Sequence, residues 1–193
     1  FAPRSGIAIG TRLNGIYERN LANAKVDLVR GYARLTGTNT VDVAGRSISA
    51  GRIVIATGGR PMVPQIPGCE LGITSDEFFE LPAQPRRVVV VGSGYISVEL
   101  GGIFAALGSE VSLVIRGEAV LRSFDAMLGA GCLRALRDEG VEVVTNTWPE
   151  SLERNAESAL ELSLANGKRL PPAVIDLADP KRDIWHRFMW LAL

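Results

Sequence analysis

The stretch that decides the fold is Arg87–Arg122, which reads RVVVVGSGYISVELGGIFAALGSEVSLVIRGEAVLR. It opens with Arg87–Val91, a β-branched run typical of a strand buried on both faces of a parallel sheet. After the Gly92-Ser93-Gly94 turn, apolar residues recur at helical spacing, at Ile96, Leu100, Ile103, Phe104 and Leu107. Gly108 is a helix stop signal, and Glu110–Ile115 alternates as a second strand. The stretch therefore predicts a strand, a glycine turn, a helix and a strand in succession.

The turn in this unit has the chemistry of an anion-binding site. Its pattern is Gly92-x-Gly94-x-x-Ser97, with serine in the place of a third glycine or alanine. Glycines let the backbone approach a pyrophosphate, and the free N–H groups and positive end of the next helix neutralise its charge. A glycine turn alone is often only a connector. Its placement between a hydrophobic strand and an amphipathic helix predicts a nucleotide-binding, Rossmann-like unit.

The end of the second strand indicates which nucleotide binds. About 20 residues after the fingerprint, an NAD site usually has an acidic residue for the ribose 2′-hydroxyl, whereas a 2′-phosphate calls for arginine. This chain has Arg116 there, and Arg122 follows six residues later. One arginine in isolation would be an ordinary solvated loop residue. Two guanidinium groups with no carboxylate at the first position favour NADP(H).

The composition is that of a packed globular chain. Of 193 residues, 47% are hydrophobic, and acidic and basic residues balance at 21 each, so we expect no nucleic-acid partner. The two cysteines, Cys69 and Cys132, have no paired spacing, which favours thiols in a reducing compartment. No apolar run reaches the roughly 20 residues that span a bilayer, so we expect no membrane partner and a cytoplasmic location. Since the chain starts at Phe1, a missing N-terminus could still hide a signal peptide.

Before the central stretch, the pattern predicts a helix and a β-meander. The helix covers Thr11–Ala22, with an apolar stripe of Leu13, Ile16, Tyr17 and Leu21. Strands are expected at Val26–Leu35, Thr40–Val43 and Arg46–Ile48, closed by a buried strand at Arg52–Ala56. Thr57-Gly58-Gly59 follows, where the backbone either approaches a ligand or simply turns. Pro61, Pro64 and Pro67 then mark a crossing between domains.

Further helices and strands follow the same logic. A short helix over Glu77–Leu81 is capped by Thr74-Ser75-Asp76. A helix over Asp125–Glu139 has an inner face of Leu128, Cys132, Leu133 and Leu136, and Val141–Thr145 is a third strand. An antiparallel meander comes next, with strands at Ser151–Arg154, Ala159–Ala165 and Lys168–Leu170.

The sequence pattern changes at the end of the chain. Ala173–Ala178 predicts one more strand, and the aromatic tail KRDIWHRFMWLAL follows Asp179-Pro180. This tail either docks on a partner or membrane surface or is a truncated or read-through end. His186 is the only histidine and has no partner nearby in sequence, so it is not assigned a catalytic role.

Five motifs together resemble the glutathione reductase family of FAD-dependent pyridine nucleotide-disulfide oxidoreductases, over about residues 11–170. The motifs are RLNGIYERNL, IVIATGG, PGCELGITSDEFFELP, VVVVGSGYISVELGGIFAALG and LVIRGEAVLRSFD. The last, with its arginine pair, is the most specific. It resembles the NADPH-using glutathione branch, whereas NAD-using lipoamide dehydrogenases typically have an acidic residue at that strand end.

The resemblance implies an α/β fold and a division of the chain. Residues 64–170 would form a Rossmann-like, three-layer NADP(H)-binding domain, with a parallel sheet and an antiparallel β-meander. Residues 1–63 would be a partial FAD-binding domain segment. Residues 171–193 would be a divergent or truncated tail, because the family continues there with a strand that ends in a second glycine motif.

The resemblance also implies roles for residues around the fingerprint. Ser93 and Ile96 would contact NADPH, and Arg116 and Arg122 would clamp its 2′-phosphate. Tyr95 is similar to the tyrosine that covers the flavin and moves aside for the nicotinamide. The implied NADP(H) set is Gly92, Ser93, Gly94, Tyr95, Ile96, Ser97, Glu99, Arg116 and Arg122. Within it, Glu99 would sit near the nicotinamide.

Four residues nearer the N-terminus would serve FAD and the substrate. The backbone at Ala33 would meet the FAD adenine, and Thr57 and Gly58 would lie against the flavin cofactor. Tyr17 resembles the tyrosine that lines the glutathione disulfide site.

The departures from the family decide what this chain can do alone. The CxxxxC pair, the histidine–glutamate pair, the first FAD fingerprint and the dimer-forming domain are not in this sequence. We expect no catalytic residue here and no disulfide reductase activity from the chain alone. The complete enzyme would be a homodimer that passes a hydride from NADPH through FAD to a disulfide and reduces glutathione disulfide. The alternatives are another NADPH-dependent reductase, trypanothione or thioredoxin reductase-like, and a non-enzymatic NADP(H)-binding module.

Overall fold

The computed structural model describes residues 4–59, 61, 63–156, 159–170 and 174–176. The chain divides into two compact units, one mainly over Ser5–Arg60 and one mainly over Pro61–Asp183. We call them the N-terminal unit and the C-terminal unit, and each is described by itself. The predicted aromatic tail and His186 lie outside the described residues.

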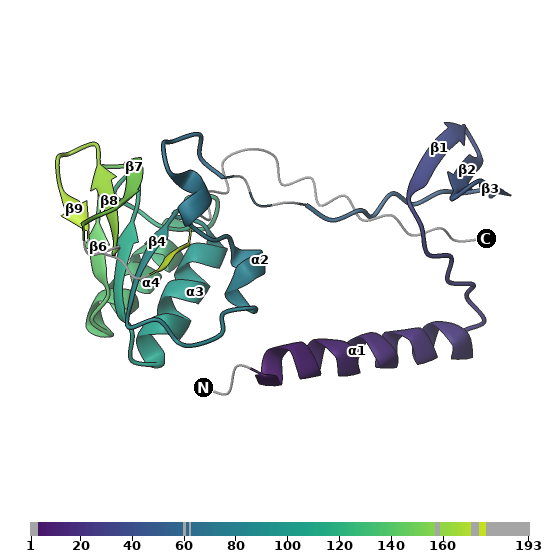
Figure 1. Ribbon diagram of the computed structural model, residues 1–193, viewed down its shortest axis with the longest axis horizontal. Helices are drawn as coiled ribbons and strands as arrows, with labels where there is room; N and C mark the ends of the chain where they lie inside the picture. Colours follow the sequence, from purple (N-terminus) through teal and green to yellow (C-terminus); the bar gives the residue numbers. More distant parts are fainter. Residues whose placement is uncertain (1–3, 60, 62, 157–158, 171–173, 177–193) are drawn as a thin grey trace. The chain divides into compact units, whose positions relative to one another are not determined.

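A four-stranded parallel sheet forms the centre of the C-terminal unit (Figure 1). Its strands are β4 (Arg87–Val91), β5 (Glu110–Val114), β6 (Glu142–Val144) and β10 (Val174–Asp176), in the order β10-β4-β5-β6. Val88, Val89, Val90 and Val91 are all buried, as expected for a strand covered on both faces. β10 lies within the segment where Ala173–Ala178 was predicted as a strand, and it pairs with β4.

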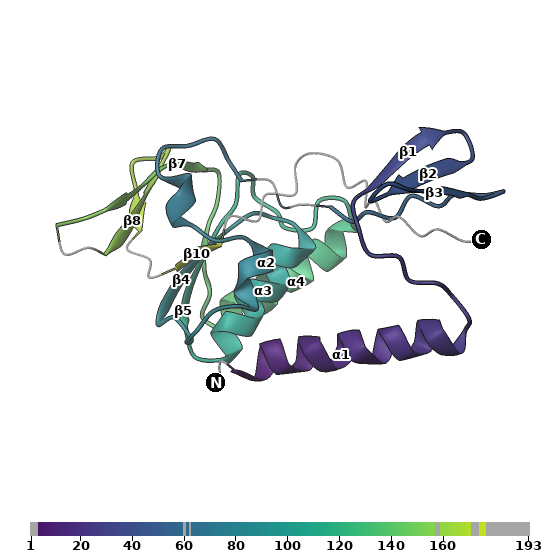
Figure 2. The ribbon, with the colours of Figure 1, turned by 45° about the vertical axis from the view of Figure 1, so that its right-hand side comes forward.

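Three layers result, because different elements cover the two faces of this sheet (Figure 2). The helices α3 (Tyr95–Ala106) and α4 (Ala126–Asp138) cover one face, around a core that includes Val90, Phe104 and Leu113. The antiparallel strands β7 (Pro149–Arg154), β8 (Leu160–Leu164) and β9 (Arg169–Leu170) cover the other, around Leu152, Leu162 and Leu164. The predicted α/β fold, with a parallel sheet and an antiparallel meander, is confirmed.

The inner face of α3 differs from the predicted stripe. Its buried residues are Ser97, Leu100, Gly101 and Phe104. Ile103 and Leu107 were predicted on this face, but they are 43% and 44% exposed. The helix has apolar residues on nearly all sides, so their spacing alone does not define which arc meets the sheet.

The inner face of α4 also differs at one position. The helix begins where predicted, since the Asp125 carboxylate accepts a hydrogen bond from the Met127 N–H at 2.8 Å. Leu136 is buried and Cys132 is half-buried, but Leu128 is 52% exposed. Gly129, the next residue, is buried instead, because the chain before the helix packs closely against it.

Two short helices precede the sheet. They are the 3-10 helix η1 (Cys69–Leu71) and α2 (Ser75–Phe78). The predicted helix Glu77–Leu81 therefore begins and ends earlier than expected, since Thr74, the first residue of the predicted cap Thr74-Ser75-Asp76, is the N-cap residue. Thr74 and Glu77 form a reciprocal capping box, and the side-chain hydrogen bond from Thr74 holds the pKa of Glu77 below its ordinary value of 4.5.

The N-terminal unit consists of α1 (Arg4–Asn23), longer than the predicted Thr11–Ala22 helix, and a small antiparallel sheet. The sheet has strands β1 (Ala33–Gly37), β2 (Thr40–Val43) and β3 (Arg46–Ser49), so the predicted strand Val26–Leu35 is wrong over residues 26–32. The predicted buried strand at Arg52–Ala56 is also wrong, since Val54 and Ile55 are 52% and 51% exposed. A β-branched run forms a buried strand only where neighbouring strands and side chains cover it.

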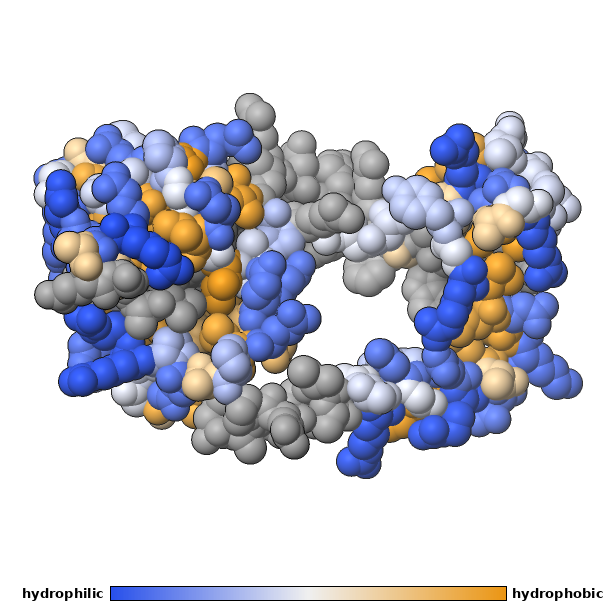
Figure 3. Space-filling model, in the orientation of Figure 1, coloured by the Kyte–Doolittle hydropathy of each residue, from blue (hydrophilic) through white to orange (hydrophobic). Residues whose placement is uncertain are grey.

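The N-terminal unit buries little apolar surface of its own. Among its described residues, the buried apolar ones are Val41, Val43 and Ala50. Larger side chains remain at its surface, including Tyr17, Leu28, Tyr32 and Leu35. Figure 3 shows apolar side chains on the visible face of this unit, at the right of the picture. Such surface is typical of a region that another element covers.

Candidate functional site

A pocket of about 410 Å³ lies at the carboxyl ends of β4 and β5, within the C-terminal unit. Four segments that are distant in sequence contribute to it. They supply Pro64 and Ile66; Val91, Gly92 and Ser93; Val114, Arg116 and Arg122; and Thr147, Trp148 and Pro149. This edge of a parallel sheet is where ligands of open α/β proteins bind.

The glycine turn is held at the edge of the pocket by backbone hydrogen bonds. Gly92 has φ 140°, a torsion that L side chains rarely adopt. Its N–H donates to the Val114 carbonyl at 3.0 Å, and the Ser93 carbonyl accepts from the Leu121 N–H at 2.7 Å. The turn is therefore tied both to β5 and to the loop that carries Arg122.

The helix α3 begins directly after this turn. Gly94 is its N-cap residue, in extended backbone conformation, and no side chain in the described part of the protein caps it. The first N–H groups of a helix lack intrahelical acceptors and carry partial positive charge. Ser97 is fully buried, so a small residue stands where the helix meets the sheet. This end of α3 has the features of an anion-binding site.

The two predicted arginines line the same pocket. Arg116 directly follows the buried Ile115, and Arg122 follows Leu121, whose φ is 53°. Among the described residues that line the pocket, none is acidic. The pocket therefore combines the glycine turn, two guanidinium groups and no carboxylate, which favours a ligand with several negative charges.

The remaining predicted residues lie outside the pocket lining. Tyr95 is 40% exposed on the first turn of α3, Ile96 is half-buried, and Glu99 is exposed. Four others belong to the N-terminal unit: Tyr17 on α1, Ala33 at the start of β1, the exposed Thr57, and Gly58 with φ 69°. Tyr17 is 62% exposed and Ala33 is half-buried.

Five lining residues lie outside the Arg87–Arg122 stretch and were missed at the level of sequence: Pro64, Ile66, Thr147, Trp148 and Pro149. Three of them follow the third strand of the parallel sheet. Because carboxyl ends of parallel strands meet at one edge, the segment after Val141–Thr145 could have been placed at the pocket from the predicted topology. Pro64 and Ile66 carry no comparable signal, since they come from the segment that precedes the sheet.

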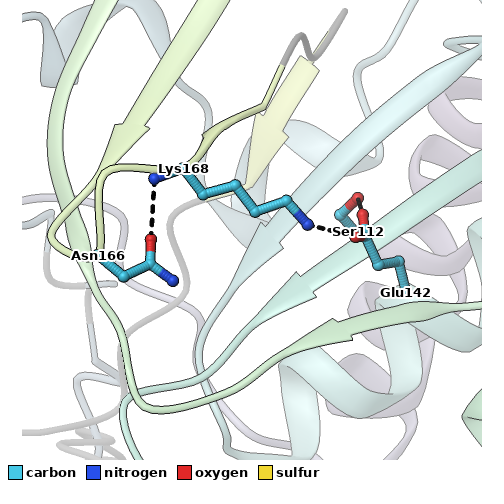
Figure 4. A network of polar contacts seen from close by, with 4 residues as sticks. All are labelled: Ser112, Glu142, Asn166 and Lys168. Atoms are coloured by element: carbon cyan, nitrogen blue, oxygen red, sulfur yellow. Dashed lines mark hydrogen bonds and ion pairs between the residues drawn. The ribbon is translucent and has the colours of Figure 1, made fainter.

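A second hollow, of about 340 Å³, lies at the opposite, amino-terminal edge of the sheet. Here Lys168 pairs with Glu142, and the Ser112 hydroxyl donates to the same carboxylate at 2.9 Å (Figure 4). The hydrogen bond from Lys168, followed by that from Ser112, holds the pKa of Glu142 below its ordinary value of 4.5. These charged groups satisfy one another, which is the pattern of a structural contact between β6 and the segment before β9.

Neither a metal centre nor a membrane span is found in the described part of the chain. No group of three His, Cys, Asp or Glu side chains there could hold a metal ion. None of the helices in those residues has both the length and the apolar character needed to cross a membrane.

The fold is that of an α/β protein, with a pocket lined by Arg116 and Arg122 at the edge of a parallel sheet. The chain belongs to the pyridine nucleotide-disulphide oxidoreductase family, whose sequence pattern matches residues 4–177. It is 40% identical over 156 residues to the chloroplastic/mitochondrial glutathione reductase of Pisum sativum, covering 81% of this chain and 28% of that protein. With glutathione reductase from Burkholderia cepacia it shares 41% identity over 156 residues, 81% of this chain and 34% of the relative.

A third relative, the glutathione reductase of Nostoc, is 36% identical over 166 residues, 86% of this chain and 36% of that protein. The chain thus spans about a third of the length of these relatives. Among solved structures, the HOCl-induced flavoprotein disulfide reductase RclA of Escherichia coli matches with a TM-score of 0.76 at 24% identity, over 93% of this chain and 42% of that one. The predicted resemblance to the glutathione reductase family is confirmed.

Proposed function

We propose that this chain is the NADP(H)-binding part, with an adjoining piece of the FAD-binding domain, of a glutathione-disulfide reductase-like flavoenzyme. The observation that carries the proposal is the 410 Å³ pocket, which joins the Gly92 turn to Arg116 and Arg122. The names of the relatives support the same class of activity for the complete protein.

The strand order supports a Rossmann-like layout. The strands lie side by side in the order β6, β5, β4 and β10, and all are parallel. Numbered by their order in the chain, this is 3-2-1-4. That is the start of the doubly wound order, in which ligands bind at the carboxyl edge where the order reverses. The reversal occurs at β4, the strand that ends in the glycine turn.

The domain division is part of the same proposal. We place the FAD-binding segment in residues 1–63 and the NADP(H)-binding domain in residues 64–170, and the division into compact units near Pro61 supports this. Residues 171–193 are treated as a separate tail, although β10 within them extends the parallel sheet.

The residues of the pocket fit NADP(H). Its volume lies within the roughly 300–1,000 Å³ of small-molecule sites. Gly92, Ser93 and Gly94, with Ser97 allowing close packing of α3, would hold the pyrophosphate, and Arg116 and Arg122 would hold the 2′-phosphate. When bound, NADPH supplies a hydride. The protein would orient it, with Ile96 in contact with the NADPH backbone and Glu99 near the nicotinamide, and Tyr95 would cover the flavin and move aside for the nicotinamide.

The FAD and substrate residues are proposed for the complete protein. Ala33, Thr57 and Gly58 would contact FAD, and Tyr17 would line the glutathione disulfide site of a homodimer. The exposed apolar side chains of the N-terminal unit support this assignment, because FAD and further protein would cover them.

Titration of the purified 193-residue chain with NADPH and with NADH, by calorimetry, tests the proposal. Charge-assisted hydrogen bonds contribute about 1.5–3 kcal/mol each, so we expect NADPH to bind at least about tenfold more tightly. Equal affinities, or no binding of either nucleotide, would contradict the arginine site. We assign the thiol chemistry to residues outside this chain. Reduction of glutathione disulfide by the chain alone would contradict that assignment.

A further inference from the structure

Trp148 is the largest side chain that lines the pocket, and it is 52% exposed. It lies between two buried residues, since Thr147 is 1% exposed and Pro149 is also buried. An exposed tryptophan between buried neighbours leaves much of an aromatic surface in water. Covering the large apolar surface of an indole is favourable, so such a residue in a pocket is a natural contact for a ligand.

Trp148 and its neighbour Thr147 are hydrogen-bonded to two other segments. The Trp148 carbonyl accepts from the Ala165 N–H at 3.0 Å. The Thr147 N–H donates to the Ile115 carbonyl at 3.4 Å, and the Thr147 hydroxyl oxygen accepts from the Asn166 N–H at 3.3 Å. The indole is therefore carried on an ordered backbone, so no loop has to be ordered when a ligand covers it.

The chemistry of the pocket indicates what would cover the indole. Arg116 and Arg122 line the same cavity and favour phosphate, and Trp148 is the only aromatic side chain among the described residues of the lining. In a nucleotide with a 2′-phosphate, the base and this phosphate are attached to the same ribose. A ligand held by the arginines therefore presents its base within reach of the same pocket wall. Aromatic side chains stack on any base, because every base has a π face.

We propose that Trp148 is the stacking platform for the adenine ring of a nucleotide that carries a 2′-phosphate. This inference rests on the proposed NADP(H) site and adds a residue to it that belongs to none of the sequence motifs. Trp148 acts as an affinity-determining residue, and it takes no part in hydride or thiol chemistry.

The test uses tryptophan fluorescence and calorimetry on the full 193-residue chain. The tryptophans are Trp148, Trp185 and Trp190, so the W185F/W190F variant reports on Trp148 alone. The probe is adenosine 2′,5′-bisphosphate, which has the adenine ring and the 2′-phosphate but no nicotinamide. We expect saturable quenching of Trp148 emission, with the same dissociation constant as the calorimetric one.

Three variants of the unmodified chain separate stacking from folding. Because Trp148→Ala removes base–aromatic stacking, we expect it to weaken binding of the probe by about 5- to 100-fold. Trp148→Phe retains a π face and should recover much of this loss. Phe79→Ala removes another aromatic side chain, 70% exposed and outside the pocket, and should leave the affinity unchanged. Circular dichroism confirms that each variant is folded.

The outcomes distinguish this inference from the proposed function. One outcome is that the probe binds and Arg116→Gln lowers its affinity, but Trp148→Ala leaves the affinity unchanged and no quenching occurs. In that case the stacking role is overturned and the nucleotide site stands. If neither the probe nor NADPH binds the unmodified chain, the proposed function fails and this inference fails with it. Quenching of Trp148 emission, together with a loss of probe affinity in Trp148→Ala, supports the role of Trp148 as the stacking platform.

Discussion

Gly129 of α4 faces the carbonyl oxygen of Val120, so closely that a β-carbon on Gly129 would stand 2.7 Å from that oxygen. Val120 is 1% exposed, and the residue after it, Leu121, donates its N–H to the Ser93 carbonyl. The loop that carries Arg122 is thus held between the glycine turn and the first turn of α4. The absence of a side chain at Gly129 allows this arrangement.

Gly129→Ala should therefore destabilise the C-terminal unit. Because the obstacle is backbone, α4 or the loop must shift, and overpacking of this kind costs about 1–3 kcal/mol. Gly131 is the matched control, since it is also inside α4 and a β-carbon on it would meet no other atom within 4 Å. Gly131→Ala should stabilise by up to about 1 kcal/mol through helix propensity. Urea unfolding of both variants measures this, and equal stabilisation of the two would refute the close approach.

Gly68→Ala should be more damaging. Gly68 has φ 78°, and a β-carbon there would stand 1.7 Å from the Leu152 carbonyl oxygen. The same segments are joined by a hydrogen bond from the Leu152 N–H to the Pro67 carbonyl, at 2.9 Å. We expect a loss above about 3 kcal/mol, from the strained torsion and the clash together. Gly108 has φ 92° and open space around it, so Gly108→Ala should cost only the torsional part, about 1–2 kcal/mol. Thermal unfolding that ranks these variants in the reverse order would be inconsistent with the packing.

The Lys168–Glu142 pair predicts a pH dependence of stability. The pKa of Glu142 is lowered in the folded state by its hydrogen bonds from Lys168 and Ser112, so its contribution is present above the unfolded-state pKa. That contribution is lost as the pH falls through the lower folded-state pKa. Since the two side chains are 41% and 51% exposed, the pair is worth no more than about 1 kcal/mol.

Glu142→Gln should accordingly be less stable than the unmodified chain at pH 7, and this difference should shrink below pH 4.5, the ordinary pKa of the group. Chemical unfolding across the acid range measures it. Glu150→Gln, at another exposed glutamate of the same unit, is the control. A difference that persists unchanged in acid would show that Glu142 acts through packing rather than charge.

Arg116→Gln and Arg122→Gln should change the choice of nucleotide. Each removes a guanidinium group proposed to bind the 2′-phosphate, so we expect NADPH to bind about tenfold more weakly per substitution. NADH lacks this phosphate, and its affinity should stay the same. Calorimetry with both nucleotides gives the ratio, and Arg134→Gln, on the exposed side of α4, is the control. Equal losses for NADPH and NADH would mean that the arginines support the fold or the pyrophosphate instead.

Local sequence patterns correctly predicted the elements whose apolar residues all have the same surroundings or whose ends are set by adjacent residues. The four valines of β4 are buried, and a run of valines is compatible with little else. The start of α4 at Asp125 and the turn at Gly108 follow from hydrogen bonding and torsions within a few residues. Arg52–Ala56 was misjudged for the opposite reason, because whether a β-branched run becomes a buried strand depends on partners elsewhere.

The sequence by itself determined the unit of strand, glycine turn and helix, the two arginines after the second strand, and membership in the family. These follow from backbone torsions, helix periodicity and short motifs, which act over a few residues. Only the tertiary structure decided which arc of α3 is buried and that, after β6, Thr147 is buried while Trp148 is exposed in the pocket. These facts depend on how strands that are distant in sequence align at one edge of the sheet, and that alignment is a property of packing.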